Sequence, residues 1–343
     1  MRVSIGIGGY ARTDNSQMVD FVQKAEALGV DSCFSAEAWG GDAVTSLAYL
    51  AALTSKIKLG TGIMQISARV PAMTAMTAVS MSVLSNNRFI LGLGASGPQV
   101  VEGLHGVAYA GPLTRLKENV QIIRMACARE KIHIDGKYHQ LPRPGGEGKA
   151  LRLDIKPVHI PIYLATLGPK ALEFTGEAAD GWLGTSFSPD FAEAHLSYIK
   201  SGAKQAGRSL DDIDLHAACS VTITEAVDEA IEASKMGVAF QMGAMGSAKT
   251  NFYNDAFCRA GFEDPAKEIQ RLWKAGKREQ AASAVPEDMV TKFQIIGTPD
   301  MISERLQVYK GVGINCINAR LAPDKGGDRM ELLEQFMDIA NKA

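Results

Sequence analysis

Glycine recurs in pairs at the ends of three apolar runs of this sequence. The pairs are Gly6 with Gly8 in VSIGIGG, Gly60 with Gly62 in IKLGTGIM, and Gly92 with Gly94 in FILGLGASG. A spacing of two puts both members of a pair on one face of a strand. Glycine inside a strand usually marks a bulge or a close approach of backbone. If these faces point inward, the strand ends bound a slot of bare backbone that suits a flat ring. The alternative is that the small residues only accommodate tight turns or a narrowing core.

Two further stretches offer backbone N–H groups to an anion. ASGPQ (95–99) directly follows the third glycine pair and is a candidate anion-binding loop. LATLGPKA (164–171) runs from a strand end into a helix with Pro169 in its first turn. Unpaired N–H groups and the helix dipole make such a start a phosphate site. An ordinary strand-to-helix turn is the alternative there.

The hexapeptide GLGASG (92–97) matches the dinucleotide fingerprint G-x-G-x-x-G. That fingerprint needs a helix directly after it and an acidic residue about 20 residues further on. The following stretch is instead interrupted by glycine and proline, at Gly103, Gly106, Gly111 and Pro112. The sequence therefore argues against a Rossmann fold.

Side-chain motifs for other chemistries are missing from the sequence. The six histidines form no HExxH or other close ligand pair, and His133 and His139 fall in a segment expected to be exposed. Neither a G-x-S-x-G elbow nor a Walker sequence occurs. We therefore predict no metal site, and the serine-hydrolase and P-loop classes have no support.

Short β-branched runs alternate with longer helical patterns along the whole chain. The expected strands are 3–7, 31–35, 57–64, 88–94, 160–165, 181–185, 213–223 and 314–319. The helices that follow them are expected at 16–28, 43–54, 71–85, 112–129, 169–178, 189–206, 225–236 and 328–341. Eight such units in one chain of this length predict a (β/α)8 TIM barrel, an α/β fold with its active site at the C-terminal ends of the strands.

Two segments depart from the alternation. Residues 131–141 (KIHIDGKYHQL) predict a β-hairpin after the fourth strand, with a type I′ turn at Asp135-Gly136. Residues 244–312 are predicted to be mostly helical, as an insertion between strands seven and eight. We expect residues 1–343 to form a single domain that contains this insertion.

Composition indicates an ordinary globular protein. The chain has 343 residues, 46% of them hydrophobic, and a net charge of −2, which gives no case for nucleic acid or an anionic membrane. No apolar run is long enough to span a bilayer, and the first residues lack a signal peptide pattern. The five cysteines are scattered and odd in number, which favours buried thiols over disulfides. A cytoplasmic protein is expected.

Five stretches, in order over most of the chain, resemble the luciferase-like flavin and deazaflavin oxidoreductase superfamily. Within it they resemble the actinobacterial branch that depends on coenzyme F420. They are SAEAWGGDAVTSLAYLAALTSKIKLGTGI (35–63), NRFILGLGASGPQVVEG (87–103), IPIYLATLGPKALEFTGEAADGWLGTSFSP (160–189), NFYNDAFCRAGFED (251–264) and IGTPDMISERL (296–306).

The resemblance implies a flavin-type ring at the C-terminal mouth of the barrel. In deazaflavin members the third strand carries a bulge with a non-proline cis peptide behind the ring, which falls here on Gly62–Ile63. Thr185, at the end of the sixth strand, matches a position facing the substrate. With the glycine ends included, the candidate cofactor-binding residues are Gly8, Gly62, Ile63, Gly94, Ala95, Ser96, Gly97, Pro98, Gln99, Val100, Ala165, Thr166, Leu167 and Gly168.

The resemblance also shows departures. Deazaflavin sugar-phosphate dehydrogenases carry an Asp-His pair after the second strand, where this chain has Ala36-Glu37, and a glutamate where it has Pro98. Their substrate is therefore not transferred. Glu37 is the candidate catalytic acid/base, because a partly desolvated carboxyl at a strand end can have its pKa raised toward neutrality. A hydrogen-bond partner for a ring nitrogen or for backbone, or an acid that supports the site without touching the substrate, is the alternative role.

The leading functional hypothesis is an F420-dependent oxidoreductase, a homodimer, that transfers hydride between the deazaflavin and a small organic substrate. An FMN-dependent monooxygenase is the first alternative, because reduced FMN activates oxygen whereas deazaflavin lacks the nitrogen that this chemistry needs. A non-catalytic flavin-binding barrel is the second. The sequence does not identify the substrate.

Overall fold

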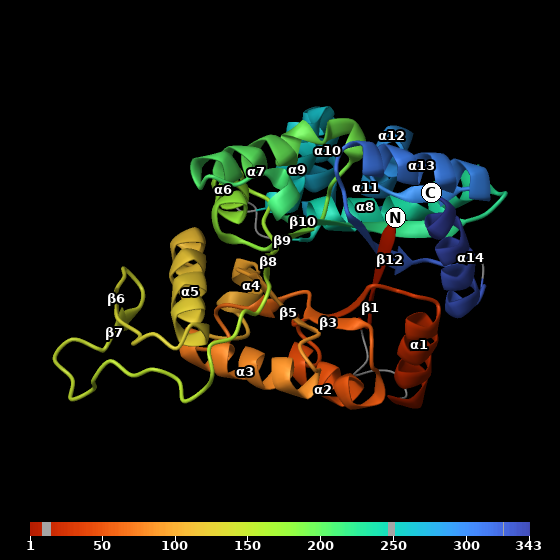
Figure 1. The fold of residues 1–343 in the computed structure, drawn as a ribbon. Helices are drawn as coiled ribbons and strands as arrows, with labels where there is room; N and C mark the ends of the chain where they lie inside the picture. The colour runs from red at the N-terminus through yellow and green to blue at the C-terminus, as the bar shows by residue number, and fades with distance from the viewer. Residues whose placement is uncertain (9–14, 246–250, 325) are drawn as a thin grey trace.

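Eight parallel strands form a closed barrel in the residues that the computed structural model describes, 1–8, 15–245, 251–324 and 326–343 (Figure 1). Around the barrel they lie in the order β1 (Arg2–Gly6), β2 (Ser32–Ser35), β3 (Lys58–Thr61), β5 (Phe89–Gly94), β8 (Ile162–Leu164), β9 (Gly181–Gly184), β10 (Asp214–Ile223) and β12 (Cys316–Leu321), which pairs with β1 again. The helices that follow them along the chain are α1 (Asn15–Ala27), α2 (Ala43–Leu53), α3 (Pro71–Leu84), α5 (Pro112–Cys127), α6 (Pro169–Ala178), α7 (Glu193–Gln205), α8 (Val227–Gly243) and α14 (Arg329–Lys342). The predicted TIM barrel is confirmed.

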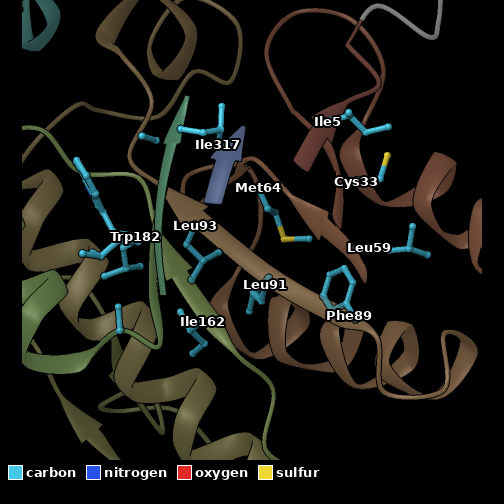
Figure 2. Close-up of a cluster of buried hydrophobic side chains, with 14 of the residues drawn as sticks. Ile5, Cys33, Leu59, Met64, Phe89, Leu91, Leu93, Ile162, Trp182 and Ile317 are labelled. Carbon is cyan, nitrogen blue, oxygen red and sulfur yellow. The ribbon is translucent and has the colours of Figure 1, made fainter. Parts of the chain in front are cut away.

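Each strand turns one face to the helices and one to the barrel interior. Ile5, Leu59, Leu91 and Ile162 lie on outward faces and belong to one continuous core with the helices (Figure 2). Alternate residues point inward, where Phe34, Ile90, Tyr163 and Leu183 form a separate small cluster. This alternation gives the strands their continuous apolar runs, because both faces are buried.

The helix starts follow the sequence signals, with one difference. Thr298 caps α13 (Pro299–Gly311), since its hydroxyl accepts the N–H of Met301. Ser188 accepts the N–H of Asp190, but it caps only a short 3₁₀ turn, Pro189–Phe191. The helix predicted over 189–206 is therefore divided, and α7 begins at Glu193.

The predicted hairpin exists, but its type I′ turn was wrong. The antiparallel strands are β6 (Ile134–Asp135) and β7 (Gln140–Leu141), so the loop holds four residues, closed by the Gly136 N–H on the His139 carbonyl. Among the described residues, neither Asp135 nor Gly136 has the positive φ that a type I′ turn needs. The physical reason is Glu118 of α5, whose buried carboxylate accepts the N–H groups of the loop residues Lys137, Tyr138 and His139.

The insertion forms a second core over the barrel. Its described part holds α9 (Phe252–Phe257), a π-helical turn (Cys258–Phe262), α10 (Glu263–Lys274), α11 (Arg278–Ser283) and α12 (Glu287–Thr291). Phe257, Ile269 and Val290 pack there against Met242 of α8. The expectation of a mostly helical segment missed one strand, β11 (Ile295–Gly297), which extends the sheet by pairing with β10.

A charged network lies at the floor of the barrel, where β1 and β10 begin. Asp214 accepts hydrogen bonds from Arg2 and, at 2.6 Å, from the Tyr163 hydroxyl, and it lies 3.1 Å from Nε2 of the buried His216. Burial alone would raise the pKa of Asp214, but these donors outweigh it and lower that pKa. Burial likewise lowers the pKa of His216, yet Cys316 and Asp214 beside it raise it to about 9.

We expect the stability of the fold to fall as pH rises from about 6.5 to about 9. A histidine with a raised pKa stabilises the folded state fully below its unfolded value, and this contribution is lost as pH passes the folded value. The shift to about 9 corresponds to about 3 kcal/mol. The free energy of unfolding in urea, measured across this range, checks the slope.

The variant His216→Gln should flatten that slope, whereas His159→Gln, which changes an exposed histidine, should leave it unchanged. An equal slope in wild type and His216→Gln would contradict the account. Stability should also fall below roughly pH 4, where the unfolded chain protonates a carboxyl like Asp214, whose folded pKa is lower.

Candidate functional site

A β-bulge interrupts the pairing of the third and fourth barrel strands at the mouth. Gly60 pairs with Ile90 and Met64 with Leu93, so four residue steps along one strand face three along the other. Pairing resumes in β4 (Met64–Gln65). The Gly62–Ile63 peptide inside the bulge is cis, as predicted. The extra residue leaves Gly62 exposed and Ile63 half-buried at the barrel opening.

The glycine faces point inward, but only the upper glycines reach the mouth. A Cβ on Gly60 would lie 2.4 Å from the Phe34 ring, and one on Gly92 would lie 1.8 Å from the Thr61 carbonyl oxygen. The space beside Gly60 and Gly92 is therefore filled by atoms of Phe34 and Thr61. The predicted slot of bare backbone does not exist at these two glycines. Gly62 and Gly94 lie one layer higher, beside the bulge.

Three predicted cofactor residues come together on this wall. A Cβ on Gly94 would lie 3.0 Å from Cδ1 of Ile63 and 3.7 Å from Cβ of Ala165. These residues come from β5, the bulge and the end of β8. Bare backbone and small apolar groups therefore line this side of the mouth, which fits the flat face of a ring.

Glu37 stabilises the bulge through hydrogen bonds to Ile63 and Gln65. Its N–H donates to the Ile63 carbonyl, its carboxylate accepts the Gln65 N–H at 3.0 Å, and its carbonyl accepts from the Gln65 amide. Arg69 pairs with the same carboxylate at 2.6 Å, and the Glu37 side chain is 8% exposed. These are the contacts of a backbone hydrogen-bond partner, the alternative left open by the sequence, while its catalytic role stays a prediction.

The two predicted anion loops both end in helix starts that no side chain of the described residues caps. Ser96 has a positive φ of 58°, its carbonyl accepts from the Tyr109 hydroxyl, and Gly97 precedes the short helix α4 (Pro98–Val101). Gly168 precedes α6 in the same way. Among the described residues, no heavy atom would lie within 4 Å of a Cβ on Gly168, so this turn faces open space in that part of the chain. The predicted residues Gln99 and Val100 lie within α4.

Thr166 and Leu167 are engaged in holding the second loop. The Thr166 hydroxyl bonds to the Thr175 hydroxyl at 2.7 Å, and its carbonyl accepts from the Trp182 indole. The Leu167 carbonyl accepts from Arg259 of the insertion at 2.6 Å. These bonds hold the second loop in place and bring the charge of Arg259 beside it.

A cavity of about 280 Å³ opens on the other side of the mouth. It lies between the ends of β9, β10 and β12 and helix α8, and the predicted substrate-side residue Thr185 lines it. The next residue, Ser186, has a φ of 50° and accepts a hydrogen bond from Gln241 of α8. Positive φ at Ser96 and Ser186, both just beyond strand ends, is typical of functional sites.

Sequence reasoning missed Arg259 and Arg320, which lie beside the second loop and in this cavity. Arg259 lies within the stretch 251–264 that carried the resemblance, but no spacing rule placed it near Leu167. Arg320 could have been found from the alternation of the last strand, which turns Asn318 and Arg320 inward. Gly8 is exposed at the end of β1, beyond the residues that form the wall.

Within the described ranges, no three His, Cys, Asp or Glu side chains gather as a metal site would need. No helix of the described part combines the length and apolar character of a membrane span. All five cysteines are free thiols, and four of them are buried.

Comparison with known proteins places the chain in a family. The model of the luciferase-like monooxygenase family matches residues 3–316. A Mycobacterium tuberculosis protein, provisionally named a coenzyme F420-dependent oxidoreductase, is 36% identical over 92% of this chain and 93% of its own. A 5,10-methylenetetrahydromethanopterin reductase of Methanolobus tindarius is 31% identical over 88% of this chain and 89% of its own.

The solved structures agree with the sequence comparison. The coenzyme F420 dependent tetrahydromethanopterin reductase of Methanopyrus kandleri superposes with a TM-score of 0.79 at 26% identity. The match covers 99% of this chain and 98% of that one. The chain therefore belongs to the luciferase-like monooxygenase family.

Proposed function

We propose that this chain is an F420-dependent oxidoreductase that transfers hydride between the deazaflavin and a small organic substrate at the barrel mouth. The observation that carries the proposal is the bulge wall, where Gly62, Ile63, Gly94 and Ala165 bound one side of the opening without polar side chains. Support comes from relatives over nearly the full chain whose names include F420-dependent enzymes.

The residues at the mouth fit a deazaflavin in two places. Ile63 and the bare backbone of Gly62 would support one face of the ring, and the Glu37 contacts keep this backbone in position. The loops at Ser96–Val100 and Ala165–Gly168 would hold the phosphate-bearing tail through backbone N–H groups. Arg259, bonded to the Leu167 carbonyl, adds positive charge beside the second loop.

The bound deazaflavin supplies a ring carbon that accepts or donates hydride. The chain's own part is to orient the ring and to exclude water from the reacting face. The insertion core, in which the ring centroids of Phe257 and Phe293 lie 4.2 Å apart, covers the cavity beside Thr185. Glu37 remains a candidate proton donor only if it exchanges its contacts with Gln65 and Arg69.

We also propose that the protein is a cytoplasmic homodimer joined through α2 and α3. These helices pack against each other, and together with Val70, the residue before α3, they expose the apolar side chains of Tyr49, Met73, Met76, Val83 and Leu84. Val83 is 72% exposed, and exposed apolar side chains that gather on one face mark interaction sites. A second copy can cover this face with the same face of its own, as a two-fold interface requires.

Light scattering of the purified protein should give the mass of a dimer, and Met76→Glu should shift it to the monomer. The reason is that a carboxylate buried between two apolar faces loses its hydration. Leu151→Glu is the matched control, because Leu151 is 74% exposed outside these helices. A monomeric wild type, or a dimer unaffected by Met76→Glu, would argue against the interface.

Titration of the full chain with F420 and with FMN, followed by the fluorescence of each, tests the function itself. We expect F420 to bind at least tenfold more tightly than FMN. Tighter binding of FMN would favour the monooxygenase alternative, which agrees with the description of the family as luciferase-like monooxygenases. Binding of neither would refute an enzyme that uses a flavin-type ring.

Bulky side chains in the two loops should weaken F420 binding without unfolding the protein. Gly168→Leu and Gly97→Leu are suitable, because both positions have ordinary φ values, −76° and −120°. In the part of the chain that the structure describes, no heavy atom lies within 3.4 Å of an added Cβ at either position. We expect the dissociation constant for F420 to rise at least tenfold, while the free energy of unfolding changes by about 0.5 kcal/mol or less. Gly148→Leu is the control, since it also meets open space but lies outside the mouth. Unchanged affinity in both loop variants would exclude this placement of the tail.

A further inference from the structure

The cavity beside Thr185 has a polar end and an apolar end. Its volume of about 280 Å³ lies close to the lower end of the range of about 300–1,000 Å³ that is typical of small-molecule sites, so it admits a small organic molecule. Arg320 and Ser220 line one part, and Phe257, Phe293 and Val238 line another. A ligand that fills it would carry both a polar group and a carbon skeleton.

Arg320 has an unpaired charge at this cavity. Among the described residues its side chain forms no ion pair and no hydrogen bond. Its field reaches Cys219 and Tyr253, where it lowers the pKa against the larger effect of burial, but neither group is an anion that could pair with it. A guanidinium presents several N–H donors in one plane, an arrangement that matches the two oxygens of a carboxylate or phosphate.

Ser220 stands directly beside Arg320 on the neighbouring strand. The two residues are register partners in the parallel pair of β10 and β12, and both lie on the inward face. The Ser220 hydroxyl has no hydrogen bond within the described part of the chain. A hydroxyl next to a guanidinium adds one more donor for the same oxyanion.

The neighbouring amide completes the polar end. Gln241 donates from Nε2 to the Ser186 hydroxyl at 2.8 Å, which fixes its side chain at the cavity wall. Thr185 precedes Ser186 at the end of β9, so the polar end lies between the barrel axis and α8. An oxyanion held by Arg320 would place the rest of a small molecule along Thr185 and the two phenylalanines.

We propose that this cavity binds substrates that carry a carboxylate or phosphate group, and that Arg320 with Ser220 determines this specificity. The proposal rests on the proposed function, because it names the substrate class of the same mouth. The shared chemistry is an oxyanion on a skeleton of about the size of benzoate.

The test uses benzoate as the probe and benzamide as its uncharged isostere, with binding to the full chain measured by calorimetry without cofactor. Benzoate should bind at least tenfold more tightly than benzamide. Arg320→Gln should remove this preference, and Arg320→Lys should keep part of it because a point charge remains. Arg152→Gln, which changes an exposed arginine in the loop after the hairpin, makes the same charge change and should leave benzoate binding unchanged.

Displacement of benzoate by inorganic phosphate would extend the substrate class to phosphate esters. Failure of phosphate to displace benzoate would restrict the class to carboxylates.

Two further measurements separate this proposal from the proposed function. Arg320→Gln should leave F420 affinity unchanged, and Gly168→Leu should weaken F420 but not benzoate. If F420 fails to bind while benzoate still depends on Arg320, only the cofactor assignment falls. Equal benzoate binding in wild type and Arg320→Gln, no benzoate or phosphate binding up to solubility, or loss of F420 affinity in Arg320→Gln would each overturn the proposal.

Discussion

The mouth of this barrel depends on one close approach, between the Thr61 carbonyl of β3 and the bare α-carbon of Gly92 in β5. Any side chain at Gly92 would begin 1.8 Å from that carbonyl oxygen. The Thr61 hydroxyl bridges the same gap, accepting the Gly92 N–H at 2.9 Å and donating to the Gly92 carbonyl at 2.8 Å. The hydroxyl thus pairs the N–H and the carbonyl of Gly92. Because of this, β3 can bulge at Gly62 and Ile63 without leaving these two groups of Gly92 unpaired.

The charged groups at the floor of the barrel are paired with one another, whereas donors at the mouth lack partners within the part of the chain that the structure describes. The floor therefore contributes to stability, and the mouth is suited to binding. At the floor, Asp214 is surrounded by Arg2, Tyr163 and His216, so its charge is fully compensated. At the mouth, the helix starts at Gly97 and Gly168 lack side-chain caps, and Arg320 lacks a counterion among the described residues. Uncompensated donors are stable there only because water or a ligand can reach them. An anionic cofactor tail and an anionic substrate are the ligands that such an opening suits.

Much of this arrangement could be predicted from the sequence, because it follows from local patterns. Alternation of strands and helices fixes the barrel, and the glycine spacing fixes which faces are bare. The role of Glu37 does not follow from such a pattern, because β2 ends at Ser35 and the contacts of Glu37 come from Gln65 and Arg69, beyond the bulge.

Other features depend on contacts between distant parts of the chain, which no local pattern carries. Glu118 widened the hairpin loop from a position 19 residues before Lys137 in the sequence. Phe34 fills the space that the glycine at position 60 leaves open, although a bare strand face predicted an empty slot. Arg259 reaches Leu167 across 92 residues. Tertiary packing decides which of several compatible local choices is used, so these contacts become visible only in the folded chain.

The most direct test of the account is a crystal structure of the full chain with F420 bound. We expect the ring to lie against the Gly62–Ile63 peptide, with the phosphate of F420 at the backbone of Gly97 and Gly168. The cavity beside Thr185 and Arg320 should then still be open to substrate. A ring seated inside that cavity, or the phosphate of F420 itself bound to Arg320, would contradict this arrangement.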